Sequence, residues 1–179
     1  MKYIKENYKF NIKISNIILL ILLGITLSAT INAIMLYTGY ISLKVVEIHE
    51  TKAVIITAFI IKILASCLIG PILEELLFRG ILFKFLSEKM SKRLSIILTT
   101  LIFAVVHTNL NNITFALFAG IIFIYFYMKT KNLLTSTIIH SACNITSLFI
   151  MFIPINLISV ILLSILLVIL IILNDKYIK

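Results

Sequence analysis

The sequence predicts an all-α protein, a polytopic transmembrane helix bundle of about six spans, one of them broken at Gly70-Pro71. Of the 179 residues, 61% are hydrophobic and 13% are charged, whereas soluble globular domains carry about 45–50% and about 25%. The apolar residues gather in runs close to the roughly 20 residues that a helix needs to cross a bilayer. No polar stretch is long enough to enclose a core, so we expect a single membrane-embedded domain over residues 17–173.

The first span is expected at residues 17–37, after a basic interfacial arm over residues 1–16 that carries four lysines and one glutamate. The apolar run is too long for the roughly 7–15 residues of a cleavable signal peptide's core, so it should be a retained helix. A polar loop follows at 38–52, where His49 is expected to be an ordinary loop residue.

The second span is expected within residues 53–86, which are apolar apart from Lys62, Gly70-Pro71, two glutamates and Arg79. As one helix this stretch would be about 51 Å long, more than one crossing needs. Proline removes a backbone donor and clashes with the preceding turn, so a kink or break at Gly70-Pro71 is expected. We expect a single broken crossing; the alternative is a re-entrant or interfacial first half.

Four more spans are expected at 94–107, 113–128, 133–153 and 157–173, separated by polar turns and followed by a tail at 174–179. Twelve of the sixteen lysines and arginines fall in the arm, the 84–93 loop, the 129–131 turn and the tail. Six spans place all of these segments on one side, and the positive-inside rule makes that side cytoplasmic. We therefore predict a multi-pass protein of the cell membrane with both termini in the cytoplasm, in contact with lipid and not with nucleic acid.

Besides Lys62, the second span contains a cluster of three ionisable residues: Glu74, Glu75 and Arg79. Ionisable groups in a transmembrane segment are costly, are usually partnered and mark candidate functional sites. Glu75 and Arg79 are four residues apart and can pair on one helix face. That pair would leave Glu74 freer to act as a base.

Further polar residues lie in the later spans. Phe103 and His107 share a helix face, as do His140 and Asn144, because each pair is separated by four residues. At about 1.5 Å per residue, Glu74, His107, His140 and Asn144 reach comparable depths, so these four groups could meet in one pocket. A carboxylate beside neutral imidazoles can hold a water and take its proton, and an amide can donate to a developing oxyanion.

Plainer interpretations apply to several of these residues. A histidine in an apolar helix is often a satisfied core residue, and Lys62 can be a snorkelling lysine at the end of a span. Cys67 and Cys143 both lie in apolar segments and are expected to be core-filling thiols. The sequence contains neither the His-Glu-x-x-His zinc motif nor the Gly-x-Ser-x-Gly elbow.

Taken together, Glu74-Glu75-x-x-x-Arg79, Phe103-x-x-x-His107 and His140-x-x-x-Asn144 resemble the three motifs of the CAAX-protease and bacteriocin-processing family, also called CPBP or Abi. The resemblance covers about residues 53–152, which would form the catalytic core. It implies an intramembrane endopeptidase whose catalytic set matches Glu74, Glu75, His107, His140 and Asn144. Glu74 would activate the water, and Glu75 would have a more supportive part. Arg79 and Phe103 match supporting positions.

The resemblance leaves the cofactor open. The family is often labelled as metalloendopeptidases, and Glu74, His107 and His140 would suit a divalent metal such as zinc. A water held by glutamate and histidine without a metal would serve equally well.

The expected function is therefore hydrolysis of a peptide or protein substrate at the cytoplasmic half of the bilayer, by a CAAX prenyl protease-like enzyme in bacterial peptide processing or bacteriocin self-immunity. One alternative is a non-catalytic membrane protein with an immunity, regulatory or scaffold role. Another is a small transporter or channel that uses the acidic pair as an ion site. The sequence leaves the substrate, the cleavage position and the oligomeric state open.

Overall fold

The computed structural model describes residues 12–41, 51–152 and 155–178, and all regular structure in these residues is helical, as predicted. The predicted arm up to residue 11, the loop over 42–50 with His49, and Pro154 lie outside the described residues. The elements in chain order are α2 (Ile14–Tyr37), α3 (Lys52–Lys62), η1 (Ile63–Ile69), α4 (Gly70–Glu75), η2 (Leu76–Leu82), α5 (Phe83–Lys89), α6 (Lys92–Val105), α7 (Leu110–Thr130), α8 (Leu133–Leu148), η3 (Ile150–Phe152) and α9 (Leu157–Tyr177).

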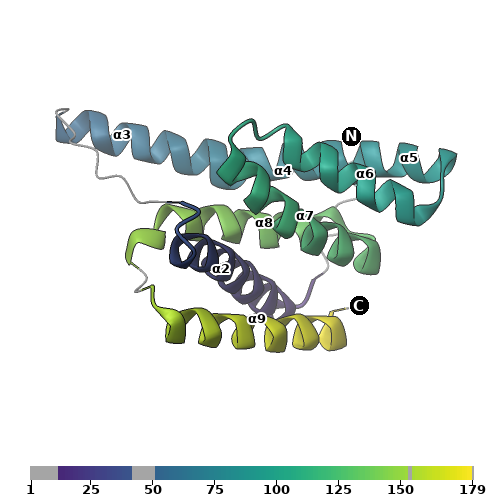
Figure 1. The fold of residues 1–179 in the computed structure, drawn as a ribbon. Helices are drawn as coiled ribbons and strands as arrows, with labels where there is room; N and C mark the ends of the chain where they lie inside the picture. Colours follow the sequence, from purple (N-terminus) through teal and green to yellow (C-terminus); the bar gives the residue numbers. More distant parts are fainter. Residues whose placement is uncertain (1–11, 42–50, 153–154, 179) are drawn as a thin grey trace.

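A close contact between α2 and α8 lies at the centre of the bundle (Figure 1). Gly24 permits this approach, since a Cβ atom there would lie 2.5 Å from the carbonyl oxygen of Ile139 and 2.6 Å from the Cβ of Ala142. The thiol of Cys143 donates to the Gly24 carbonyl at 3.2 Å. Small residues are the usual means by which helices approach closely in a bilayer. Cys143 and Cys67 are both buried and free, as expected for core-filling thiols.

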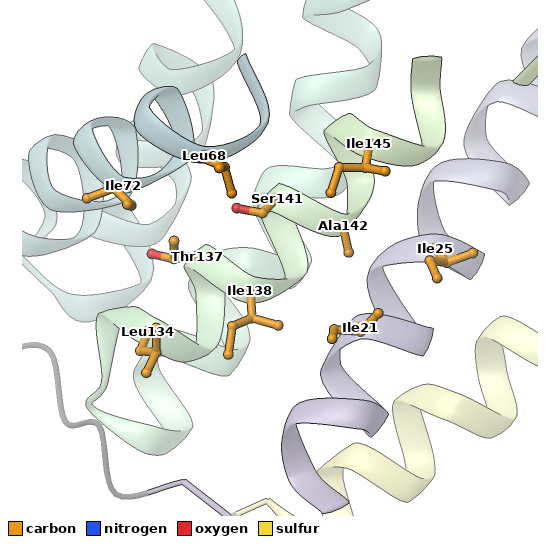
Figure 2. A pocket seen from close by; sticks show the side chains of 10 residues that line it. All are labelled: Ile21, Ile25, Leu68, Ile72, Leu134, Thr137, Ile138, Ser141, Ala142 and Ile145. Atoms are coloured by element: carbon orange, nitrogen blue, oxygen red, sulfur yellow. The ribbon is translucent and has the colours of Figure 1, made fainter. Parts of the chain in front are cut away.

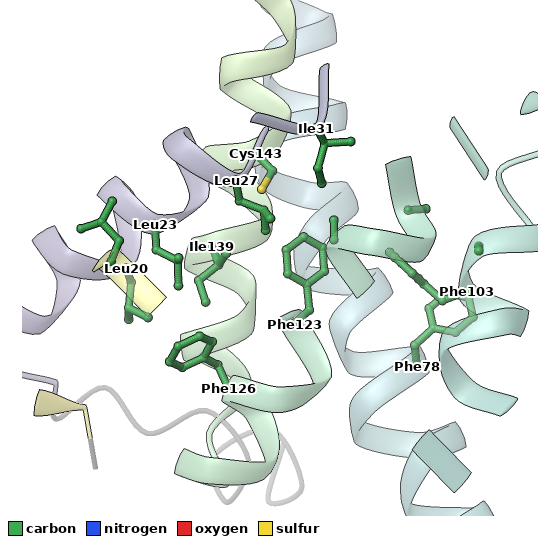
Figure 3. Packing of buried hydrophobic residues seen from close by; sticks show 14 of the residues in the cluster. Leu20, Leu23, Leu27, Ile31, Phe78, Phe103, Phe123, Phe126, Ile139 and Cys143 are labelled. Atoms are coloured by element: carbon green, nitrogen blue, oxygen red, sulfur yellow. The ribbon is translucent and has the colours of Figure 1, made fainter. Parts of the chain in front are cut away.

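The buried apolar core extends from α2 across α8 and α7 to α6 and to the long helix that α3 to α5 form together (Figure 3). Its members include Leu20, Leu23, Leu27, Ile139, Phe123, Phe126, Phe78 and Phe103. Helix α9 lies on the other side of α2, where the amide of Asn174 donates to the Leu19 carbonyl at 3.1 Å (Figure 1). Many large apolar side chains on α9 and on the long helix point outward, as expected where helices face lipid.

Segments α3 to α5 follow one another without interruption and form one long helix along one side of the bundle (Figure 1). The discontinuity predicted at Gly70-Pro71 therefore takes the form of a change in winding and not of a gap in the helix. The π-helical segment η1 ends at Ile69, and α-helical winding begins at Gly70. Pro71 is the second residue of α4 and has no backbone N–H with which to continue the hydrogen bonding of this helix.

Within the described residues, four helices are long and apolar enough to cross a membrane: α2, the long helix over Val54–Lys89, α7 and α9. The predicted spans at 94–107 and 133–153 correspond to α6 and α8, which have 14 and 16 residues. These rise by about 21 and 24 Å, less than the roughly 30 Å of a hydrocarbon core. Helix α8 stops at Leu148, before the single 3-10 turn of η3.

The helix ends gather at two opposite ends of the bundle. At the first, Lys129 of α7 bonds Asp175 of α9 at 2.5 Å, and Phe83 of α5 packs edge-on against Tyr127 of α7. We call this the basic end, because it carries Lys13, Lys84, Lys89, Lys92, Arg93, Lys129, Lys131 and Lys176 at the helix termini.

We call the opposite end the open end. There Tyr40, just after α2, lies 3.0 Å from Thr114 in the first turns of α7. Ser28 of α2 likewise meets Ser147, near the last residue of α8, at 3.0 Å. Helix α7 begins three residues earlier than predicted, because the side chain of Asn109 caps it by accepting from the Asn111 N–H at 2.9 Å.

Candidate active site

One cavity of about 710 Å³ brings together side chains from α2, the long helix, α7, α8 and the end of α6. Glu74, His107, His140 and Asn144 all line it. These are the four groups whose depths the sequence predicts to be similar, and they come from three separate stretches of the chain. The expected convergence of these side chains is therefore present in the structure.

Glu74 lies between the two histidines. Its Oε2 atom is 3.8 Å from Nε2 of His107 and 3.8 Å from Nε2 of His140. That separation is too long for a direct hydrogen bond, and this buried oxygen has no hydrogen-bond partner in the described part of the structure. The side chain of Glu74 as a whole is 34% exposed to the cavity, whereas its Oε2 atom is buried.

The other ring nitrogen of each histidine is already bonded. Nδ1 of His107 lies 2.8 Å from the carbonyl oxygen of Phe103, and Nδ1 of His140 lies 3.1 Å from Oε1 of Glu75. Both partners are acceptors, so each Nδ1 carries a hydrogen and donates it. In the neutral rings each Nε2 then presents a lone pair toward Glu74. Three acceptor atoms thus surround one spot, which suits a donor such as water.

Glu75 faces away from the cavity, although it is adjacent to Glu74 in the sequence. Its Oε1 accepts a hydrogen bond from Nη1 of Arg79 at 2.8 Å, and both side chains are completely buried. Nη2 of Arg79 donates to the carbonyl oxygen of Gly120 at 3.3 Å. The predicted i to i+4 pair is confirmed, and Glu75 reaches the site only through His140.

Phe103 separates the arginine from the two imidazoles. The guanidinium carbon of Arg79 lies 4.2 Å from the centroid of the Phe103 ring, a cation–π distance. The same ring meets His107 and His140 edge-on, with centroid distances of 4.9 and 5.8 Å. Phe103 is 1% exposed, so it fixes both imidazoles from a position inside the core. This contact is consistent with the supporting position expected for it.

Asn144 is held by the long helix. Its Nδ2 donates to the carbonyl oxygen of Ser66 at 2.7 Å. In an α-helix that carbonyl would accept from Gly70, but the Gly70 N–H bonds Ala65 instead, five residues back. The next residue is Pro71, which has no N–H to donate. The π winding and the proline therefore leave the Ser66 carbonyl open to Asn144, and one of the two amide hydrogens expected to serve an oxyanion is used here.

The fit of a metal to this site is incomplete. Glu74, His107 and His140 supply a donor set that zinc accepts. In the described part of the chain, however, no three His, Cys, Asp or Glu side chains lie close enough together to form a ready-made metal centre. A divalent cation would have to draw these three side chains together. We therefore derive no catalytic step through a metal.

A second cavity of about 500 Å³ lies between α2, the long helix and α8, and it is almost entirely apolar (Figure 2). Ile21 and Ile25 of α2 lie across from Leu68 and Ile72 of the long helix, with side chains of α8 such as Ile138 between them (Figure 2). None of the predicted site residues lines this cavity. Its polar lining side chains are the hydroxyl residues Thr137 and Ser141, and it contains no ionisable group.

Several residues at the site have no signal in the sequence. Phe123 stacks on His140 with a centroid distance of 4.7 Å, and the backbone of Gly120 anchors Arg79. Asn32 lines the cavity and bonds Ser147 at 3.5 Å. These contacts are made between helices, so spacing within one helix could not predict them. Lys62 also lines the cavity. The sequence suggests only a snorkelling lysine there and does not predict this position at the site.

Comparison with known proteins identifies the fold family. The family model described as "Type II CAAX prenyl endopeptidase Rce1-like" matches residues 55–146, just over half of the chain. The chain belongs to the Rce1-like family. The matched range contains all three motifs, from Glu74 to Asn144, and this confirms the resemblance to CAAX-type and bacteriocin-processing proteins. Membership in this family and the long apolar helices also support a membrane location.

One curated relative is the protein named "Putative membrane peptidase YdiL" of Bacillus subtilis (strain 168). It is 32% identical to this chain over 100 residues, which cover 55% of this chain and 41% of the relative. The chain thus spans about two fifths of the length of the relative that it matches. No solved structure matches the chain significantly.

Proposed function

We propose that this Rce1-like protein is a membrane endopeptidase that cleaves a peptide bond with a water activated by Glu74. The observation that carries the proposal is the buried, unpartnered Oε2 of Glu74, which lies 3.8 Å from the Nε2 atoms of two histidines on different helices. A water in that gap can donate to the carboxylate and to an imidazole and still keep a lone pair for attack. Family membership and the relative's printed name support the same reaction class.

The proposed reaction has two proton transfers. As the water oxygen bonds to the carbonyl carbon, its proton passes to the Glu74 carboxylate. The second hydrogen of the Asn144 amide donates to the oxyanion that forms. The carbon–nitrogen bond then breaks, and Glu74 returns the proton to the leaving amine. The products are a carboxylic acid and an amine, and Glu74 ends ionised as it began.

Glu75, Arg79 and Phe103 have positioning parts in this proposal. Glu75 accepts the Nδ1 hydrogen of His140, which orients the Nε2 lone pair toward the water. Arg79 keeps Glu75 ionised in the core. His107 obtains the same orientation from the backbone carbonyl of Phe103.

Glu74→Gln provides the test, with Glu88→Gln on the exposed surface of α5 as a matched control. The two purified proteins and the parent are incubated in detergent with peptide pools, and new termini are measured by mass spectrometry. We expect Glu74→Gln to lose at least about 10²-fold in rate, since general-base groups contribute about 10²–10⁴-fold. Glu88→Gln should match the parent. Equal cleavage by Glu74→Gln and the parent would contradict the proposal and would favour a non-catalytic scaffold.

The finer role, peptide processing or bacteriocin self-immunity, is proposed from the family resemblance. It predicts that a host expressing the parent, but not the Glu74→Gln variant, survives exposure to a bacteriocin or releases a processed peptide. Full protection by the Glu74→Gln variant would indicate immunity through binding alone.

A further inference from the structure

The site cavity opens at the end of the bundle opposite to the basic residues. Its wall includes Asn32 and Met35 from the last turns of α2, Asn112 from the first turn of α7, and Ser147 and Leu148 from the last turn of α8. The lysines that flank these helices lie at their other ends, as given above for the basic end. Three helices thus place the cavity away from the positive charge.

The long helix and α6 also place the cavity away from the basic end. From Glu74 the cavity continues toward Ser66 and Lys62, in the direction away from α5 and its lysines. Helix α6 begins beside Arg93 at the basic end and stops two residues before His107 at the cavity. All five segments that form the cavity wall therefore place the cavity at the open end of the bundle.

The charge distribution decides which side of the membrane this end faces. Lysine and arginine in short loops are retained in the cytoplasm, whereas acidic residues contribute little to orientation. Among the described residues, the eight lysines and arginines listed above lie at the basic end, whereas only Lys52 and Lys62 lie toward the open end. The cavity and the charged helix ends belong to the same helices. The side of the membrane assigned to the cavity therefore does not depend on how many helices the whole protein has.

We propose that the site receives its substrate from the extracytoplasmic side of the membrane, where the substrate is a polypeptide that has already been translocated. This differs from the cytoplasmic half of the bilayer that the sequence suggested. The cavity joins a polar mouth, with Asn111 and Asn112, to apolar walls that include Phe115 and Ala119. Such a surface suits an apolar peptide segment that enters from the outer leaflet. The proposal rests on the proposed function for cleavage, but the orientation of the cavity can be tested separately.

Cysteine accessibility tests the orientation without any need for activity. Asn112→Cys places a thiol at the cavity mouth, and Ser87→Cys places one on exposed α5 at the basic end without changing charge. The native Cys67 and Cys143 are buried, so the parent chain gives the background. In intact bacteria, a membrane-impermeant maleimide should label Asn112→Cys at least about tenfold above that background, and it should label Ser87→Cys only after permeabilisation. The reverse pattern, or equal labelling of both variants in intact cells, would overturn the proposal.

Sealed vesicles then test substrate entry. A cleavable apolar peptide from the pools described above is added outside right-side-out vesicles and outside inverted vesicles. We expect cleavage in the right-side-out preparation and at least a tenfold lower rate in the inverted one, both abolished by Glu74→Gln. Faster cleavage in inverted vesicles would overturn the proposed side of entry. Absence of cleavage in both, together with the expected labelling pattern, would instead contradict the endopeptidase function and leave the orientation established.

Discussion

Two adjacent glutamates have different environments because successive helix positions point about 100° apart. Glu74 faces the cavity and is partly exposed, whereas Glu75 is completely buried against Arg79. In a dry core an ionised carboxylate is costly unless a partner compensates its charge. The ion pair with Arg79 therefore offsets the cost of burying the Glu75 carboxylate. The reacting carboxylate and the orienting carboxylate thus belong to adjacent residues, and their different burial gives them different roles.

Arg79→Ala is predicted to destabilise the protein by about 3–5 kcal/mol, because it leaves the Glu75 carboxylate buried without a cation. The midpoint of thermal unfolding in detergent measures this, with the exposed Arg93→Ala as the matched control. A Glu75→Gln/Arg79→Met double variant should recover much of the loss, because neither buried charge remains. Equal midpoints for Arg79→Ala and Arg93→Ala would show that the buried pair contributes no stability.

Chelation tests whether the site depends on a metal. The proposed mechanism uses a water held by Glu74 and the two histidines, so we expect the cleavage rate to remain within about twofold after exhaustive dialysis against a chelator. Added zinc should not raise it, because the ligand atoms are not gathered into a ready-made centre. Metal content of the purified protein is measured in parallel. Loss of activity that zinc restores would assign Glu74, His107 and His140 to a metal instead.

The sequence predicts the contacts made within one helix better than those between helices. The Glu75–Arg79 pair and the Phe103–His107 contact follow from a spacing of four residues, and both are present. The bond from His140 to Glu75 joins residues 65 positions apart and depends on how α8 packs against the long helix. Helical periodicity gives the face that a side chain takes but not its neighbour on another helix.

At the scale of elements, the winding of the long helix changes on both sides of the segment that carries the two glutamates. Segments η1 and η2 lie on either side of α4, which carries both glutamates. Such π-helical turns are rare and often occur at functional sites. The sequence predicts a discontinuity at Gly70-Pro71 from the missing donor of proline, but it cannot predict that wider winding would absorb it. That outcome depends on Asn144, which takes up the Ser66 carbonyl from another helix.

Pro71→Ala is predicted to lower the cleavage rate about three- to tenfold while the protein stays folded. The alanine supplies an N–H that can compete with Asn144 for the Ser66 carbonyl and so loosens the position of the amide. Rates and unfolding midpoints are compared for the parent, Pro71→Ala, Asn144→Ala and the double variant. If Pro71 acts through Asn144, its replacement should have little further effect in the Asn144→Ala background. Fully additive effects would contradict this coupling.

At the scale of the whole molecule, the cavity lies beside the ends of two short helices, α6 and α8. Helices α6 and α8 both begin at the basic end and end at Val105 and Leu148, next to residues that line the cavity. The cavity is on the side away from the positive charge. The order of the helices follows from the sequence, since apolar length and lysine position are local properties, but only four of the six predicted spans are long enough for a full crossing in the described residues. The early ends do not follow from the sequence, because apolar residues continue beyond Leu148.

The short helices also predict that activity depends on bilayer thickness. With rises of about 21 and 24 Å, α6 and α8 would match a thin bilayer better than one of about 30 Å. In a thick bilayer, acyl chains would extend over the open end and hinder entry to the cavity, and mismatch costs fractions of a kcal/mol per Å. We therefore expect kcat/KM to be several-fold higher in vesicles of short-chain phosphatidylcholine than in long-chain ones.

The measurement uses one peptide in both kinds of vesicle, with the amount of folded enzyme fixed by labelling Ser87→Cys at the basic end after permeabilisation. The peptide concentration in each membrane is determined separately, so that partitioning does not imitate a change in kcat/KM. Detergent-solubilised enzyme from each preparation is the control, and both samples should regain the same rate once the bilayer is removed. Equal kcat/KM in thin and thick vesicles would show that the bilayer does not cover the mouth of the cavity. The early ends of α6 and α8 would then serve packing alone and not access.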